Sequence, residues 1–263
     1  MLSRLTRLQA VAVCALPVVA LLATAAFAPL PFSLAQPGLT ANVLGKNQGT
    51  EVITVSGAPT RETSGQLRMT TIEATNPDAH VALGDILDSW FRTDRAVMPR
   101  DAVYPSGEST KEIERHNTAQ MKESQDAATE AALAYLHLGD KNVKVTLELA
   151  DVGGPSAGLL FTLGIIDKLD GDGSGGDLTG GRTVAGTGTI DPDGTVGAVG
   201  GVALKTQAAR RDGATVFLVP KAECSDAKSE LPEGLRLVPV TTLKSAVNSL
   251  VALEKGKGPI PGC

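Results

Sequence analysis

Residues 143–169 read VKVTLELADVGGPSAGLLFTLGIIDKL, and this stretch decides the fold. Val143 to Leu149 alternates apolar and polar side chains, which predicts a strand. Ala157 to Leu169 is an apolar run that predicts a buried helix. The turn between them is rich in glycine and carries Ser156. We therefore expect one serine beside the N-terminus of a helix, where the helix dipole is positive.

A second glycine-rich stretch, GGVALK at residues 200–205, brings a candidate base. A serine hydroxyl needs a base before it attacks a carbonyl carbon, and a lysine can act if burial removes its proton near neutral pH. Apolar neighbours of Lys205 favour such burial. Glycines such as Gly154 also let backbone N–H groups point toward one oxyanion. The pattern predicts a hydrolase with Ser156 as nucleophile and Lys205 as base.

The N-terminus predicts a membrane segment. Arg4 and Arg7 precede an uncharged run from Ala10 to Ala28, and apolar character continues to Leu34. About 20 apolar residues span a bilayer, and preceding basic residues keep the N-terminus in the cytoplasm. We assign residues 1–9 to a cytoplasmic tail and 10–34 to a single-pass signal-anchor in the cell membrane, with the rest extracytoplasmic. The AFA sequence at 26–28 leaves a cleaved signal peptide as an alternative, and a buried helix as a third.

The cysteines suit an oxidising compartment. Cys14 lies in the membrane segment, so Cys224 and Cys263 remain to form a disulfide that pins the C-terminal tail. Two free thiols are the alternative. We divide the remainder into a linker at 35–50, a proteolytic domain at 51–255 with the nucleophile and lysine motifs in 143–255, and a tail at 256–263.

Elsewhere, periodicity and turn residues predict strands, helices and loops that interleave without a strict βαβ rhythm, so the fold class is α+β. The helix at 83–91 should place Leu83, Ile86, Leu87 and Trp90 on one face. The full set is strands at 51–55, 66–74, 216–219 and 235–240, helices at 83–91, 110–138, 205–211 and 245–253, a hairpin at 183–199 around the turn DPDG, and loops at 98–107 and 171–181.

Four motifs in order resemble the proteolytic domain of Lon proteases over roughly residues 65–255. They are MKES at 121–124 followed by Ala127, GPSAG at 154–158, Thr187-Gly188, and Gly200-Gly201 followed by Lys205 and Ala208-Ala209. The resemblance implies the Lon proteolytic-domain fold after one transmembrane helix. It implies a Ser156/Lys205 dyad in which the Thr187 hydroxyl helps to orient the lysine. It also implies a homo-oligomeric ring.

The membrane segment further resembles the anchored Lon-like proteases of Gram-positive bacteria, with two departures. Those proteases usually carry a PDZ domain before the nucleophile, and residues 139–152 leave no room for one. Cytoplasmic Lon enzymes often have an aspartate three positions before the serine, where this chain has Gly153, with Asp151 nearby but displaced. Recognition of peptide tails and gating by an acid are therefore expected to differ here.

Composition and decoy motifs limit the partners. The net charge of −5 gives no basic surface, so no nucleic acid is expected. Leu204 stands where a phosphate loop needs glycine before its lysine. The calcium-like run that starts at Asp170 has Gly181 in its twelfth position instead of glutamate. We expect no cofactor and no metal, and protein or peptide substrates beside the membrane.

The resulting hypothesis is a membrane-anchored, ATP-independent serine endopeptidase that acts on extracytoplasmic proteins. Two alternatives stay open. One is a non-catalytic, membrane-anchored adaptor with a Lon-like fold. The other is a phosphate-binding enzyme, because glycine-rich turns at helix N-termini also bind phosphate.

Overall fold

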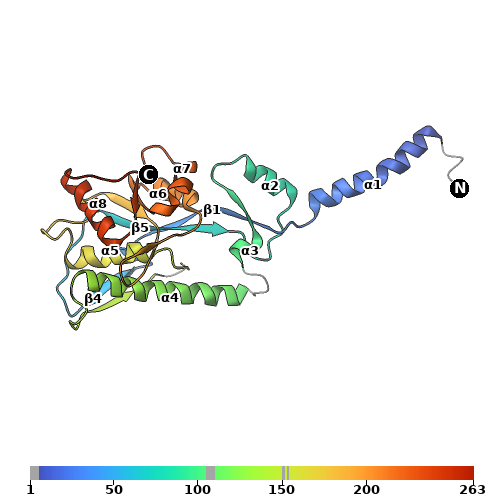
Figure 1. The fold of residues 1–263 in the computed structure, drawn as a ribbon. Helices are drawn as coiled ribbons and strands as arrows, with labels where there is room; N and C mark the ends of the chain where they lie inside the picture. Colours follow the sequence, from blue (N-terminus) through green and yellow to red (C-terminus); the bar gives the residue numbers. More distant parts are fainter. Residues whose placement is uncertain (1–5, 105–109, 150–151, 153) are drawn as a thin grey trace. The chain divides into compact units, whose positions relative to one another are not determined.

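The computed structural model describes residues 6–104, 110–149, 152 and 154–263 (Figure 1). The chain forms two compact units. The first combines Met1–Ala35 with Ala74–Gly107, and the second combines Gln36–Glu73 with Glu108–Cys263. Each unit is described by itself below.

The first unit begins with the predicted apolar helix, α1 (Arg7–Phe27). Thr6 caps it by accepting a hydrogen bond from the Gln9 N–H at 3.3 Å. None of its residues is buried, and its most apolar window has a mean hydropathy of 2.4. A 21-residue helix is about 31 Å long, which matches the hydrocarbon core of a bilayer. By length and composition α1 can cross a membrane.

The rest of the first unit contains short elements. The start of β1 (Phe32–Asn42) pairs antiparallel with β6 (Ala96–Pro99), and α2 (Leu83–Trp90) and α3 (Arg100–Val103) flank this ladder. The loop predicted at 98–107 is therefore wrong in its first part, because Met98 and Pro99 are paired strand residues. Its residues 105–107 lie outside the described part of the chain.

The predicted linker at 35–50 is also wrong. Its first half belongs to β1, and its second half contains a short hairpin of β2 (Lys46–Asn47) and β3 (Thr50–Glu51). Burial alternates along β1, but the buried side chains are small, as at Ser33 and Ala35. Small buried residues carry little hydropathy, so composition suggested a linker where the backbone pairs as a strand.

The second unit is built on a sheet in which β5 (Gln66–Ala74), β8 (Thr183–Gly186), β11 (Val216–Pro220) and β12 (Arg236–Val240) run parallel in that order. β1 lies on the other side of β5. Two smaller pairs complete the strands. They are β4 (Ile53–Ser56) with β7 (Lys144–Leu147), and β9 (Thr189–Ile190) with β10 (Val196–Gly197).

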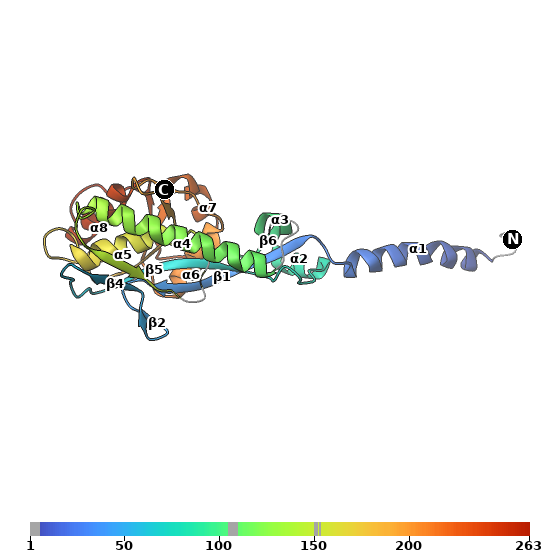
Figure 2. The same cartoon turned by 90° about the horizontal axis from the view of Figure 1, so that it is seen from below.

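Helices cover both faces of this sheet (Figures 1 and 2). Val216 and Leu218 of β11 face a cluster that contains residues of α4 (Thr110–Tyr135), α5 (Gly158–Leu169) and α8 (Leu243–Lys255). Phe217 and Val219 face the other cluster, with α6 (Val202–Arg211) and α7 (Cys224–Ser229). This alternation follows from the period of two in a strand. The mixed α and β fold is confirmed.

The strand and helix that flank Ser156 have the predicted order. β7 occupies residues 144–147, and every residue of α5 from Gly158 to Asp167 is buried. The structure starts α6 at Val202, three residues earlier than predicted, and adds α7, which the pattern did not predict.

The disulfide predicted between Cys224 and Cys263 is present, with the two Cα atoms 5.3 Å apart. It links the start of α7 to the C-terminal tail across a sequence separation of 39. In the chain-entropy description, closing a loop of that length stabilises the folded state by about 4 kcal/mol. Cys14 is a free, exposed cysteine on α1.

Candidate active site

The Ser156 loop is fixed from two sides. The Gly154 N–H donates to the Asn117 carbonyl of α4 at 3.2 Å, and the Ser124 hydroxyl of α4 donates to the Pro155 carbonyl at 3.0 Å. On the other side, the Gly188 N–H donates to the Ser156 carbonyl at 3.0 Å. Gly154 has a φ of +87°, a conformation that a side chain disfavours. The serine therefore sits in a turn whose backbone is held in place.

Lys205 reaches the same region from α6, on the opposite face of the sheet. The side chain is only 4% exposed, and its Nζ donates a hydrogen bond to Thr187 Oγ1 at 3.2 Å. The Lys205 amine and the backbone of Ser156 both contact Thr187, which lies just beyond the carboxyl end of β8, directly after Gly186.

The N-terminus of α6 sets the position of the lysine. Gly201 precedes the helix with a φ of +68°, and a Cβ there would lie 2.9 Å from Ile72 Cγ2. The Asp226 carboxylate of α7 accepts hydrogen bonds from the N–H groups of Val202 at 2.8 Å and Ala203 at 3.3 Å. This is an N-terminal cap supplied by another helix, and it fixes the first turn of α6.

Burial lowers the pKa of Lys205 to about 8, because a charged amine loses its hydration inside the protein. The negative charges of Asp226 and Glu223 oppose this shift. Burial therefore acts on the pKa of this lysine in the direction expected from its apolar neighbours in the sequence.

Thr187 connects the two groups. It is fully buried, and its hydroxyl donates to the Ser156 carbonyl oxygen at 3.3 Å while accepting from Lys205. Its own N–H donates to the Leu218 carbonyl at 3.1 Å, which ties it to β11. The structure thus brings together Gly154, Ser156, Thr187 and Lys205, the residues proposed from sequence. Gly153 and Asp151 lie outside the described residues.

Two positioning residues were missed. Ser124 is a buried polar residue on the same face of α4 as the buried Met121 and Ala128, so its helical spacing could have marked it. Asp226 could not be found in this way, because α7 is short and its relation to α6 depends on tertiary packing.

A groove adjoins the serine loop. Its cavity volume is about 850 Å³, and it lies between α4 and the side chains of Leu147, Leu149 and Val152. Asn117, which holds Gly154, is one of its lining residues. Met121, Leu147, Leu149 and Val152 give it an apolar wall, whereas Glu114 and Lys122 line it with charge.

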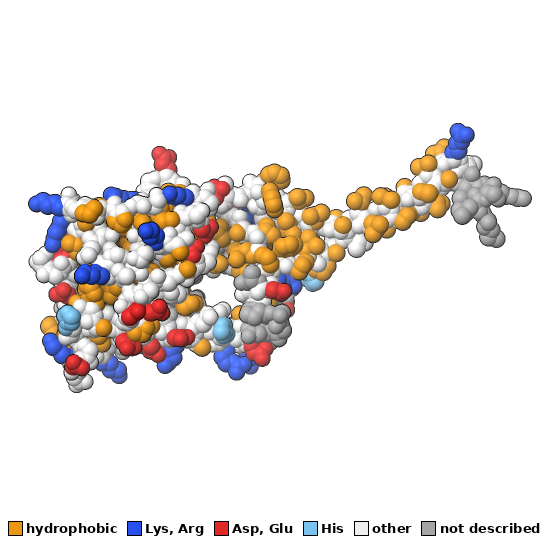
Figure 3. Space-filling view, viewed as in Figure 1, with side chains coloured by type: hydrophobic (Ala, Val, Ile, Leu, Met, Phe, Trp, Pro, Cys, Tyr) orange, Lys and Arg blue, Asp and Glu red, His pale blue; other side chains and the backbone are white. Residues whose placement is uncertain are grey.

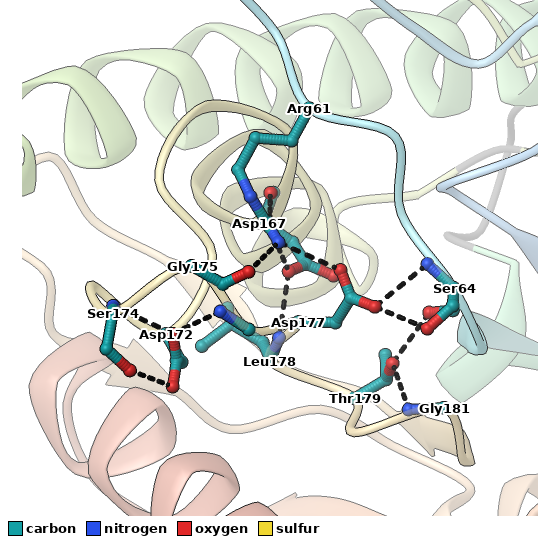
Figure 4. Close-up of polar contacts among 11 residues, drawn as sticks. Arg61, Ser64, Asp167, Asp172, Ser174, Gly175, Asp177, Leu178, Thr179 and Gly181 are labelled. Carbon is teal, nitrogen blue, oxygen red and sulfur yellow. Dashed lines mark hydrogen bonds and ion pairs between the residues drawn. The ribbon is translucent and has the colours of Figure 1, made fainter.

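A second polar cluster holds the 171–181 loop (Figure 4). Arg61 is 3.6 Å from an Asp167 carboxylate oxygen and 3.2 Å from one of Asp177. The Leu178 N–H donates to Asp167 at 2.8 Å. Asp172 accepts backbone hydrogen bonds from Ser174 and Gly176 within its own loop. Within the described ranges, no group of three or more His, Cys, Asp or Glu side chains is arranged to hold a metal ion.

Burial raises the pKa of Asp167 to about 6, and the nearby charge of Arg61 opposes this shift. The side chain is fully buried, but its partners are a guanidinium and a backbone amide of a surface loop. This cluster is part of the loop architecture, separate from the residues around Ser156.

Comparison with known proteins identifies the family. The family model of the Lon protease (S16) C-terminal proteolytic domain matches residues 115–252, just over half of the chain, and this range includes Ser156, Thr187 and Lys205. The chain belongs to this family, and the resemblance seen in the motifs is confirmed.

Curated relatives agree. The chain is 26% identical to an archaeal Lon protease of Halobacterium salinarum over 172 residues, which is 61% of this chain and 24% of the relative. It is 36% identical to a Lon protease of Chloroflexus aggregans over 105 residues, 38% of this chain and 12% of the relative. Lon protease 1 of Myxococcus xanthus is 34% identical over 105 residues, with 39% and 12% covered. The chain thus spans a quarter or less of these relatives.

Proposed function

We propose that the protein is a membrane-anchored serine endopeptidase that uses Ser156 as nucleophile and Lys205 as general base. One observation carries this proposal. A lysine amine that is almost completely buried is hydrogen-bonded to a threonine hydroxyl, and that hydroxyl is bonded to the backbone of the serine in a glycine turn.

The pKa of about 8 gives Lys205 a usable fraction of neutral amine. At pH 7.5, roughly a quarter of the lysine would be neutral, compared with about 0.1% for a lysine with its ordinary pKa. The neutral Lys205 amine takes the proton of the Ser156 hydroxyl as the serine oxygen bonds to the peptide carbonyl carbon. The resulting Lys205 ammonium then donates that proton to the leaving amine of the substrate. The neutral Lys205 amine serves as base a second time when a water molecule attacks and releases the acyl group.

The start of α5 supports the charged intermediate. The developing oxyanion forms close to Ser156, two residues before α5 begins at Gly158. The N-terminus of a helix carries partial positive charge, and glycines allow backbone N–H groups to converge on the oxyanion. None of these proposed steps uses ATP, so we propose that hydrolysis by this chain is independent of nucleotide.

The groove beside α4 is suited to the substrate. Its apolar wall favours extended peptides with aliphatic side chains near the cleaved bond. Proteins outside the cytoplasm are the proposed substrates. This placement is supported by the length and composition of α1 and by the Cys224–Cys263 disulfide, since disulfides persist in oxidising compartments. Protease added to intact cells should therefore remove the domain that follows α1, whereas a cytosolic marker remains protected.

Ser156→Ala in the full-length protein, purified in detergent, tests the proposal. We expect the cleavage of a fluorogenic peptide library to fall by about 10³-fold or more, because only the nucleophilic oxygen is lost. Ser225→Ala is the matched control, because Ser225 is an exposed serine of α7. Equal melting temperatures would show that the fold is intact. Turnover retained by Ser156→Ala would overturn the mechanism.

A further inference from the structure

Helix α2 exposes three of its four large apolar side chains, and only Ile86 is half-buried. Leu87 is 52% exposed, Trp90 is 77% exposed, and Phe91, directly after the helix, is 86% exposed. The polar Ser89 is buried instead. Single exposed apolar residues are common, but four large ones together (Leu83 is the fourth) mark a surface that something covers. We call Leu83, Leu87, Trp90 and Phe91 the α2 apolar face.

This face lies next to the proposed membrane helix within the first unit. The Leu30 N–H, three residues after α1 ends, donates to the Val81 carbonyl at 2.8 Å, just before α2 begins. The two helices also contact each other. Figure 3 shows hydrophobic side chains gathered over α2 and over the place where α1 joins the rest of its unit. With only residues 28–31 between α1 and β1, this unit cannot move far from the bilayer surface.

We propose that α2 is an interfacial helix, which lies on the bilayer surface beside α1 and inserts the α2 apolar face among the lipids. The proposal rests on the membrane anchoring proposed above. Aromatic side chains such as Trp90 and Phe91 favour the boundary between headgroups and acyl chains. The first unit is then held to the membrane at two points, and a single transmembrane helix would supply only one.

The charges around α2 define which lipid surface it fits. Arg92 pairs with Asp94 at 2.9 Å, and Arg95 pairs with Asp88 at 3.3 Å. Paired charges leave little attraction for anionic headgroups, so binding depends on apolar burial. We therefore expect α2 to bind zwitterionic lipids as well as anionic ones, with little effect of salt.

The chain carries its own probe, because Trp90 is its one tryptophan. The full-length protein, reconstituted in phosphatidylcholine vesicles, should show blue-shifted tryptophan emission. Lipids brominated on acyl carbons near the headgroup should quench this emission at least twofold, in low and high salt alike. Emission typical of a water-exposed indole, quenched by acrylamide and unaffected by brominated lipid, would overturn the proposal. Blue-shifted emission that is not quenched by brominated lipid and that varies with protein density would also overturn the proposal. It would indicate that a second copy of the chain covers the α2 apolar face.

A separate readout distinguishes this proposal from membrane anchoring. Flotation with vesicles after a carbonate wash reports on α1. Loss of flotation contradicts the anchoring, whereas flotation without lipid quenching contradicts only the role of α2. Leu87→Asp should reduce the lipid quenching of Trp90 at least twofold and leave flotation unchanged. Leu231→Asp, at a 39% exposed leucine of the second unit, should leave both unchanged.

Discussion

Lys205 and Asp167 are two buried ionisable side chains in the same unit, and their surroundings differ. Burial moves both toward the neutral form. It lowers the pKa of Lys205 to about 8 and raises the pKa of Asp167 to about 6. The Lys205 amine donates to a neutral hydroxyl, whereas Asp167 faces the Arg61 guanidinium and accepts from the Leu178 N–H.

The difference teaches that burial alone does not make a catalytic group. Asp167 connects the end of α5 to the 171–181 loop, and its two partners, a guanidinium and a backbone amide, both favour the carboxylate over the neutral acid. Lys205 is held near the serine loop by a contact that tolerates either charge state, which suits the proposed role as a base that gains and loses a proton. Both residues reduce stability near neutral pH, because each is then largely charged in a site that favours the neutral form.

The largest expected effect is on activity, where substitutions of Lys205 and of Asp167 should differ. Lys205→Arg and Lys205→Ala should each reduce kcat/KM for a peptide substrate by about 10³-fold or more, because a guanidinium stays protonated and alanine has no base. Asp167→Asn should stay within about threefold of the wild type, since it removes no group from the serine site. An active Lys205→Arg enzyme would show that Lys205 is not the base. Comparable losses from Asp167→Asn would remove the distinction between the two sites.

The next effect concerns the stability of the lysine site. The folded pKa of Lys205, about 8, lies below the unfolded value of about 10.4, so the unfolded state binds more protons in between, and stability rises with pH across this window. Lys205→Met should therefore be about 2–3 kcal/mol more stable than the wild type at pH 7, and the gap should narrow as pH rises from 8 toward 10.4. Urea unfolding of both proteins at pH 7 and at pH 10 measures the difference in stability and its change with pH. A less stable Lys205→Met protein at pH 7 would contradict the lowered pKa.

Asp167 should show the mirror image, with a smaller effect. Its folded pKa, about 6, lies above the unfolded value of about 3.9, so the contribution of Asp167 to stability is most favourable below pH 4 and is lost as pH rises through 6. Asp167→Asn, which keeps an oxygen for the Leu178 N–H, should be about 2 kcal/mol more stable than the wild type at pH 7.5 and equal to it at pH 4. Melting temperatures across this range test the sign. A constant gap at all pH values would contradict titration of Asp167 as its cause.

The smallest expected effect is a change in the pKa of Lys205. The charge of Asp226 opposes the lowering of the pKa of Lys205, so Asp226→Asn should lower that pKa further while retaining an oxygen for the Val202 N–H. The alkaline-rising limb of kcat/KM against pH should move to lower pH. Asp167→Asn is the control and should leave this limb in place. A limb that stays fixed in Asp226→Asn would show that Asp226 acts on α6 only as a cap.

Much of the candidate site could be predicted because its chemistry is local in sequence. Gly154, Ser156, Thr187 and Lys205 all lie in short motifs whose residue types suit their proposed roles. The strand before Ser156 shows a clear alternation of apolar and polar residues, and the helix after it is a continuous apolar run. The order of these two elements was therefore also predictable.

The features that could not be predicted depend on tertiary packing, that is, on which elements cover a given side chain in the folded protein. The periodicity of residues 83–91 identified a helix with one apolar face, but it could not tell that the face is exposed. The same limit hid Asp226, which acts on α6 from a different helix. The supposed linker at 35–50 failed for a related reason, since its strand buries small side chains that composition does not distinguish from a flexible segment.

The hydroxyl of Thr187 has a single proton, and this fixes the direction of the hydrogen bond between Thr187 and Lys205. That proton goes to the Ser156 carbonyl, so Thr187 Oγ1 has only lone pairs to offer the amine 3.2 Å away. The amine must donate to it whether it has two N–H groups or three. The contact therefore survives each uptake and release of a proton, and the lone pair of the neutral amine always points away from the threonine. As the proposed base, Lys205 can therefore keep its hydrogen bond to Thr187 in both protonation states of a catalytic cycle.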